Sequence, residues 1–154
     1  MKYTWKEIFN QAKRFHKSSY LLNQNEDPDL KIVSWSNGAF ALELYFKALN
    51  LKLNPKAKIF NHKINEIFKK FSIEIQNNLK DVYKNEINQR PHLAEEIKQI
   101  KQILPDFSID YEYQLEYIEK SFISFRYIYE KNKAVLMFYN EIRNSVITEI
   151  KRAI

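Results

Sequence analysis

Residues 29–52 read DLKIVSWSNGAFALELYFKALNLK, and this stretch decides the fold that the sequence predicts. Apolar residues recur in it at alternating spacings of three and four, which places them on one face of a helix. They are Ile32, Trp35, Ala39, Leu42, Phe46 and Leu49. Further apolar residues fall on the other faces. A helix that is apolar most of the way round is typical of the interior of a bundle.

The ends of this helix are marked by residues that begin and stop helices. Asp27 and Pro28 predict its start, as a capping residue followed by a proline at the first helical position. Pro55 predicts its end. Gly38 is the only glycine in the chain and lies in mid-helix, where glycine costs about 0.5–1 kcal/mol relative to alanine. Either the helix tolerates it, or another helix crosses closely there; we expect the close crossing.

The rest of the chain shows the same helical periodicity between breaks. Thr4 and Glu7 form a capping box that opens a helix to about residue 22. Asn61 caps a short helix to about residue 71, and Ser72 begins another. Further helices are predicted over residues 92–104, from about 108 to 131, and from 134 to the C-terminus. The sequence therefore predicts an all-α fold, an antiparallel up-and-down bundle of four to six helices in a single domain over residues 1–154.

Composition excludes several other classes of protein. One glycine and four prolines in 154 residues argue against an all-β fold with many tight turns. There are no cysteines, and the three histidines have no metal-ligand spacing, so we expect no disulfide and no metal site. The sequence also has no Walker loop and no dinucleotide fingerprint, so we expect no cofactor. The N-terminus lacks a signal-peptide core, and no apolar run reaches membrane-spanning length. We therefore expect a cytoplasmic protein that does not enter the membrane.

Positive charge is concentrated in one stretch of the chain. The formal net charge is +6, and residues 47–70 contain seven lysines against one acid, Glu66. The remaining residues balance, with 18 basic (25 − 7) against 18 acidic (19 − 1). The lysines are Lys47, Lys52, Lys56, Lys58, Lys63, Lys69 and Lys70. This run is interpreted either as a binding surface for nucleic acid or another polyanion, or as a solvated lysine face.

Three charged residues interrupt apolar helices and need partners there. Glu43 and Lys47 are four residues apart, in the favourable order for an ion pair on one helix. Arg126 lies among aromatic residues of a late helix. We hypothesise that Glu43 and Arg126 meet across two core helices, with Lys47 or Glu130 completing a polar network. Such a network would be either a buried ion pair that fixes helix packing, or a ligand-binding or active site. The third possibility is that these residues are separate, exposed charges that form no network.

His62 is the histidine that suits a functional site best. An imidazole can act as a general base or contact a phosphate, because its unperturbed pKa allows either charge state. The alternative is that His62 packs at a helix start and bonds the backbone. The catalytic candidates are therefore Glu43, His62 and Arg126. The binding candidates are the seven lysines with Tyr129 and Glu130, where Tyr129 either stacks on bases or packs in the core.

Three segments, taken in order, resemble a known family. They are residues 37–49, NGAFALELYFKAL, residues 61–64, NHKI, and residues 125–130, FRYIYE. Together they resemble the HEPN family of small prokaryotic helical proteins, over roughly residues 30–131. The resemblance implies an antiparallel helical bundle, often dimeric, that associates with nucleotides or RNA. It also implies a place in toxin–antitoxin or defence systems.

The chain departs from one motif of that family. Many HEPN ribonucleases carry an arginine followed four to six residues later by a histidine, whereas Arg14 and Arg90 precede His16 and His92 by only two. We therefore expect a homodimer that binds RNA or a nucleotide without this ribonuclease motif, with a nucleotidyltransferase-like protein as partner. One alternative is a ribonuclease or toxin acting through Glu43, His62 and Arg126. The other is a non-catalytic interaction or dimerisation module.

Overall fold

The computed structural model of the protein describes residues 3–58, 62–125 and 138–153, and these form helices and no strand. The helices are α1 (Trp5–Asn23), α2 (Pro28–Leu53), α3 (Ile64–Lys69), α4 (Ile73–Ile87), α5 (Leu93–Ile103), α6 (Tyr111–Phe125) and α7 (Tyr139–Arg152). The predicted all-α class is confirmed. The described residues contain seven helices, where the sequence predicts four to six. Within them, no helix combines the length and the apolar character that crossing a membrane requires.

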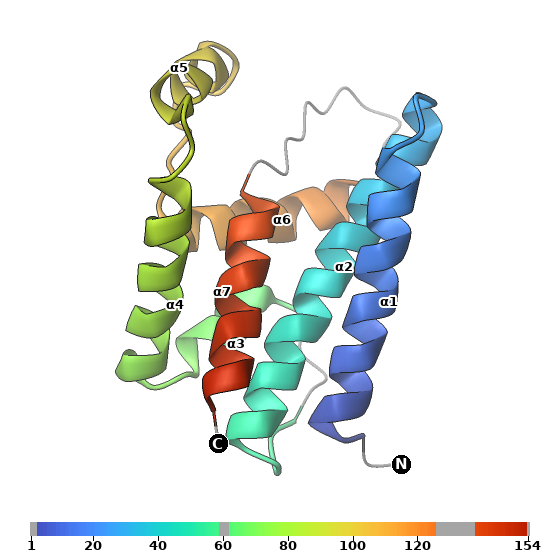
Figure 1. Cartoon of the computed structure of the whole chain (residues 1–154), viewed down its shortest axis with the longest axis vertical. Helices are drawn as coiled ribbons and strands as arrows, with labels where there is room; N and C mark the ends of the chain where they lie inside the picture. Colours follow the sequence, from blue (N-terminus) through green and yellow to red (C-terminus); the bar gives the residue numbers. More distant parts are fainter. Residues whose placement is uncertain (1–2, 59–61, 126–137, 154) are drawn as a thin grey trace.

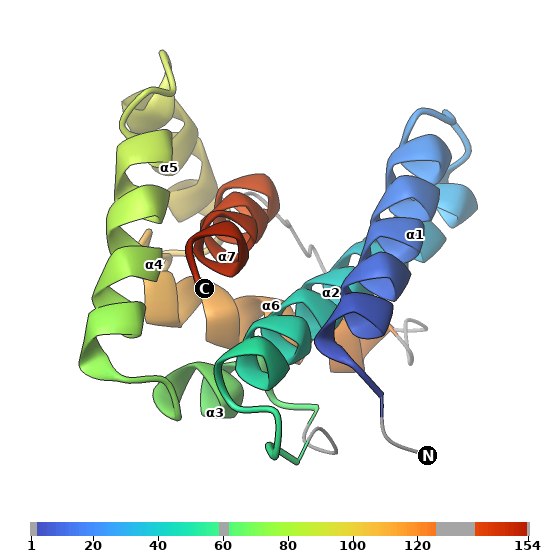
Figure 2. The same ribbon diagram turned by 60° about the horizontal axis from the view of Figure 1, so that its bottom comes forward.

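The helices do not all run up and down. Helices α1, α2, α4 and α7 lie roughly along the long axis of the molecule, and α6 crosses behind them (Figure 1). The view from below shows the same crossing, with α5 at one end of the molecule and the short α3 at the other (Figure 2). Helices α1 and α2 form an antiparallel hairpin, and α2 also packs against α3, α6 and α7. Contacts on several sides explain why the α2 sequence is apolar on several faces.

The boundaries of α2 agree with the signals in its sequence. Asp27 caps the helix by accepting a hydrogen bond from the backbone N–H of Asp29 at 2.9 Å, and Pro28 is the first helical residue. The helix ends at Leu53, two residues before Pro55. Tyr45 and Phe46 are fully buried, whereas Trp35 and Phe40 are only partly buried and Val33 is exposed. The prediction of a central, buried helix is therefore confirmed for the part of α2 that follows Gly38.

Gly38 lies where two other helices approach α2 closely. A Cβ atom added at Gly38 would lie 3.1 Å from Oγ of Ser19 on α1 and 3.7 Å from the ring of Tyr139 on α7. The first distance is tighter than an ordinary van der Waals contact, so a side chain here requires Ser19 to move. The predicted close crossing at Gly38 is confirmed.

The starts predicted at Thr4 and Ser72 are confirmed, whereas the helix expected from about residue 108 begins at Tyr111. Thr4 and Glu7 form the predicted capping box of α1, and Ser72 caps α4 by accepting from the backbone N–H of Ile75. Helix α3 begins at Ile64, and the predicted cap Asn61 lies outside the described residues. The predicted extension of α6 to residue 131 and the predicted start of the last helix at residue 134 also lie outside them.

Candidate functional site

The carboxylate of Glu43 is buried in α2 and has two basic partners. Lys47, one turn further along α2, donates from Nζ to Glu43 Oε1 at 2.6 Å. His62 Nδ1 lies 2.9 Å from the same oxygen. Glu43 is 1% exposed and Lys47 is 6% exposed, so the reading of separate exposed charges is excluded for this pair. We call Glu43, Lys47 and His62 the His62 site.

His62 connects this buried pair to the protein surface. It lies just before α3, and its side chain is 72% exposed although Nδ1 contacts a carboxylate that is almost completely buried. When the ring is neutral, a hydrogen bond to a carboxylate holds the proton on Nδ1 and leaves the lone pair on Nε2. The sequence left open that His62 bonds the backbone at a helix start. In the structure His62 instead bonds the side chain of Glu43 on α2. The arrangement resembles the carboxylate–imidazole pairs that orient catalytic and ligand-binding histidines.

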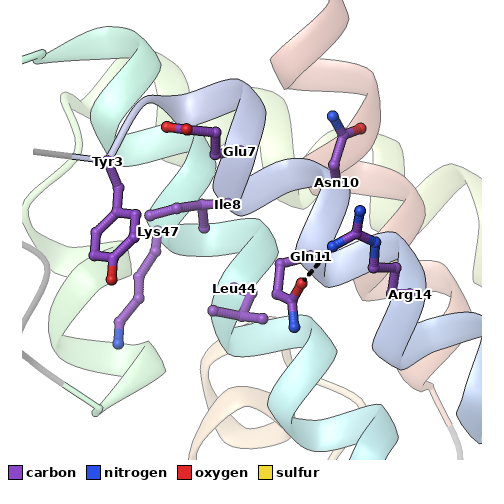
Figure 3. A pocket seen from close by; sticks show the side chains of 8 residues that line it. All are labelled: Tyr3, Glu7, Ile8, Asn10, Gln11, Arg14, Leu44 and Lys47. Carbon is purple, nitrogen blue, oxygen red and sulfur yellow. Dashed lines mark hydrogen bonds between the residues drawn. The ribbon is translucent and has the colours of Figure 1, made fainter.

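Lys47 also lines a cavity between α1 and α2. The cavity has a volume of about 530 Å³, and Figure 3 shows Tyr3 and Lys47 towards one end of it and Gln11 and Arg14 towards the other. Arg14 donates to Gln11 Oε1 at 3.2 Å. Hydrogen bonds from the backbone N–H and side chain of Thr4 lower the pKa of Glu7, whose carboxylate also lines the cavity. The wall thus carries both signs of charge, and Lys47 joins it to Glu43.

The seven lysines of residues 47–70 do not form one surface. Lys47 is buried, and Lys52 is half-buried, with Nζ donating to the backbone carbonyl of Ile150 at 2.6 Å and lying 4.7 Å from the ring centre of Trp5. Lys63 is exposed and pairs with Glu66 at 3.0 Å. The others are exposed, namely Lys56, Lys58, Lys69 and Lys70. Lysines that are continuous in the sequence therefore lie in separate environments in the fold, because the helices and turns direct their side chains differently.

Three candidates from the sequence lie outside the described residues. These are Arg126, Tyr129 and Glu130. The hypothesis that Glu43 meets Arg126 therefore stays a prediction. The part of that hypothesis in which Lys47 joins Glu43 is confirmed.

A second polar cluster joins α1 to α7, and the sequence did not reveal it. Tyr139 Oη lies 3.2 Å from His16 Nδ1, and Arg143 Nη1 lies 2.5 Å from His16 Nε2. Burial, and next the positive charge of Arg143, lower the pKa of His16 to about 4. The imidazole is therefore neutral at neutral pH, as a ring that accepts from a guanidinium must be. Burial raises the pKa of Tyr139.

The same side of α7 is tied to α4 and to the loop that follows it. Arg143 Nη2 donates to Asn144 Oδ1 at 2.8 Å, and Asn144 in turn donates to Glu86 on α4 at 3.0 Å. Arg90 bonds Glu141 at 3.1 Å. The pairs that join α7 to other parts of the fold are between 51 and 127 residues apart, so no local spacing could have paired them. We interpret this network as packing that fixes α7 against α1 and α4.

No group of His, Cys, Asp and Glu side chains in the described parts of the chain could hold a metal ion. Comparisons with protein-family models, with curated proteins and with solved structures find no match to the chain. The geometry of the His62 site and the charge around it are therefore the features that indicate a function.

Proposed function

We propose that the protein binds single-stranded RNA through the surface around His62. The observation that carries the proposal is the hydrogen bond between a buried carboxylate, Glu43, and an exposed imidazole, His62. Lys47 alone would neutralise Glu43 within the core. The bond to His62 orients a ring that stands in solvent, where it can donate to or accept from a ligand.

The charge near His62 suits a polyanion. Lys58 and Lys63 are its close neighbours in the sequence and are exposed. Lysines that neutralise phosphates release condensed counterions, which gives RNA binding a strong dependence on salt. The resemblance of residues 37–49, 61–64 and 125–130 to HEPN proteins adds support, because that family is associated with RNA and nucleotides.

The same resemblance supports two finer statements about the protein. The first is that the helices are a HEPN-like bundle that forms a homodimer. The second is a role in a toxin–antitoxin or defence system beside a nucleotidyltransferase-like protein. Sedimentation of the pure protein tests the dimer, and copurification with the product of a neighbouring gene tests the partner.

Phosphodiester cleavage is the second candidate function, and the orientation of His62 favours it. With Nδ1 bonded to Glu43, Nε2 is the atom that can remove a proton from an attacking hydroxyl. Glu43 would then be a positioning residue that stabilises the protonated ring. General-base catalysis of this kind contributes about 10²–10⁴-fold to a rate, so its loss is easily measured.

Incubation of the pure protein with a labelled single-stranded RNA tests both candidates. We expect affinity to fall as salt rises, and to fall about fivefold in His62→Ala, the effect of losing roughly 1 kcal/mol. His92→Ala, which removes another exposed histidine, is the matched control and should bind as the wild type does. Cleavage that is lost in both His62→Ala and Arg126→Ala would support the second candidate. Absence of binding at low salt would remove both.

A further inference from the structure

Three of the exposed lysines surround an open recess at the lower end of the molecule. The recess has a volume of about 500 Å³ and lies between the end of α2, the turn that follows it and the junction of α3 with α4. Lys56 and Lys58 come from the turn, and Lys70 follows α3. A volume of this size lies within the range of about 300–1,000 Å³ that is usual for small-ligand sites.

Among the described residues that line this recess, all the charge is positive. Lys56, Lys58 and Lys70 are the charged ones, and none of the described lining residues is a carboxylate. Within the described parts of the chain, none of the three forms an ion pair. Other exposed lysines do find acids, for example Lys63 with Glu66 and Lys120 with Glu116. Three adjacent ammonium groups without a counter-charge favour an anion at this place.

Local hydrogen bonds hold two walls of the recess in place. Asn54, which caps the end of α2, accepts from the backbone N–H of Lys56 at 3.1 Å, and its carbonyl accepts from Ala57 at 2.9 Å. On the opposite wall, Ser72 caps α4. The N-terminal turn of this 15-residue helix adds partial positive charge on the same side as Lys70, and the acid of that turn, Glu74, is not among the described residues that line the recess. Lys56 and Lys70 therefore extend from hydrogen-bonded backbone, Lys70 through its own N–H to the carbonyl of Ile67 at 3.1 Å.

The recess also has an apolar wall. Leu53, Phe71 and Ile75 line it, and the Phe71 ring is fixed by stacking on Phe46 at 6.3 Å between ring centres. A bare inorganic anion would leave this wall unused. A ring-bearing molecule could lie against it while its charged group meets the lysines.

We propose that this recess binds a phosphate monoester carried on a ring-sized organic group. A monoester carries about −1.5 to −2 charges at neutral pH, which three lysines can match. The monoester is either a free phosphorylated small molecule or the 5′-terminal phosphate of an RNA strand. If the ligand is the 5′-terminal phosphate of RNA, the inference rests on the proposed RNA binding, because the recess then recognises one end of the bound strand.

Calorimetric titration with adenosine 5′-monophosphate, and with adenosine as the matched compound without phosphate, tests the proposal. We expect the wild type to bind the monophosphate and not adenosine. The triple variant Lys56→Gln, Lys58→Gln, Lys70→Gln should bind it at least tenfold more weakly. The triple variant Lys17→Gln, Lys98→Gln, Lys101→Gln loses the same charge at exposed positions outside the recess and should bind as the wild type does. Equal loss in the two triple variants, or no binding by the wild type, would overturn the inference.

Two further measurements separate this site from the His62 site. Binding of the monophosphate that persists in His62→Ala would support an independent site, and its loss there would contradict it. RNA binding by a wild type that does not bind the monophosphate would overturn the inference and leave the RNA proposal standing. Binding of a short RNA with and without its 5′-phosphate shows where the monoester comes from. A preference for the phosphorylated strand that disappears in the Lys56, Lys58, Lys70 variant assigns the site to RNA ends. Equal binding of the two strands assigns the site to a free phosphate monoester.

Discussion

Glu43 Oε1 and His62 Nδ1 lie 2.9 Å apart although the two residues are separated by 19 positions in the sequence. The contact joins a buried carboxylate of α2 to a residue whose side chain is 72% exposed. Burying a carboxylate is costly unless it is paired, and Glu43 meets this condition with two donors on one oxygen. The functional account depends on that contact, and the stability of the core depends on the neighbouring pair with Lys47.

The first prediction concerns the buried ion pair. Glu43→Gln leaves the Lys47 ammonium buried without its counter-charge, and we expect a loss of about 3–5 kcal/mol in the free energy of unfolding. Urea denaturation measures it. Lys47→Met should cost a similar amount, because it leaves the Glu43 carboxylate with His62 alone.

The double variant Glu43→Gln, Lys47→Met is the decisive control for this pair. It removes both charges together, so we expect it to cost clearly less than the sum of the two single variants. A coupling energy near zero would mean that the two groups do not depend on each other, which would contradict a buried pair.

The second prediction concerns the close packing at Gly38. Gly38→Leu should overpack the crossing of α1, α2 and α7 and lower the free energy of unfolding by about 1–3 kcal/mol. Gly38→Ala brings a Cβ to 3.1 Å from Ser19 Oγ, so its effect depends on whether Ser19 yields. In a Ser19→Ala background that contact is gone, and Gly38→Ala should stabilise the protein by about 0.5–1 kcal/mol through better helix propensity. If Gly38→Ala changes the free energy of unfolding equally in the wild-type and Ser19→Ala backgrounds, a neighbour other than Ser19 restricts the space at Gly38.

The third prediction concerns the pH dependence of stability. The pKa of His16 is about 4 in the folded protein and about 6.5 when the chain is unfolded. Between these values the unfolded chain binds a proton that the folded protein does not, so the free energy of unfolding should fall as pH falls from 6.5 towards 4. Because the imidazole is only half-buried, solvent screening limits the loss to about 1–2 kcal/mol.

Urea denaturation near neutral pH and near pH 5 checks the effect of His16. His16→Gln keeps a polar side chain but cannot titrate, so its stability should change less with pH than that of the wild type. His92→Gln is the control at an exposed histidine and should keep the wild-type dependence. An identical loss of stability in the wild type and in His16→Gln would contradict the assignment.

Local signals in the sequence predicted most of the helices. The capping residues Thr4, Asp27 and Ser72 marked three starts correctly, because capping is an interaction between residues two or three positions apart. The burial of α2 followed from its periodicity, and the Glu43–Lys47 pair followed from a spacing of four on one helix. These features depend on short-range geometry, which a sequence displays directly.

Features that depend on the packing of distant helices could not be predicted in this way. Nothing in the sequence indicated that α6 crosses the other helices, since crossing is decided by how several apolar faces fit together. The contact between His16 and Arg143 spans 127 positions. The run of lysines could be interpreted from the sequence as one surface. In the fold, Lys47 is buried, Lys52 bonds the carbonyl of Ile150, and three other lysines line a recess.

The imidazole proton resonances of His62 during titration with a short single-stranded RNA test the central claim most directly. The chain has three histidines, so His16, which is half-buried, and His92, which is exposed at the start of α5, are internal controls. We predict that RNA shifts the His62 resonances until binding saturates and leaves those of His16 and His92 in place. Saturable RNA binding with unchanged His62 resonances would show that the RNA lies elsewhere and would contradict the account.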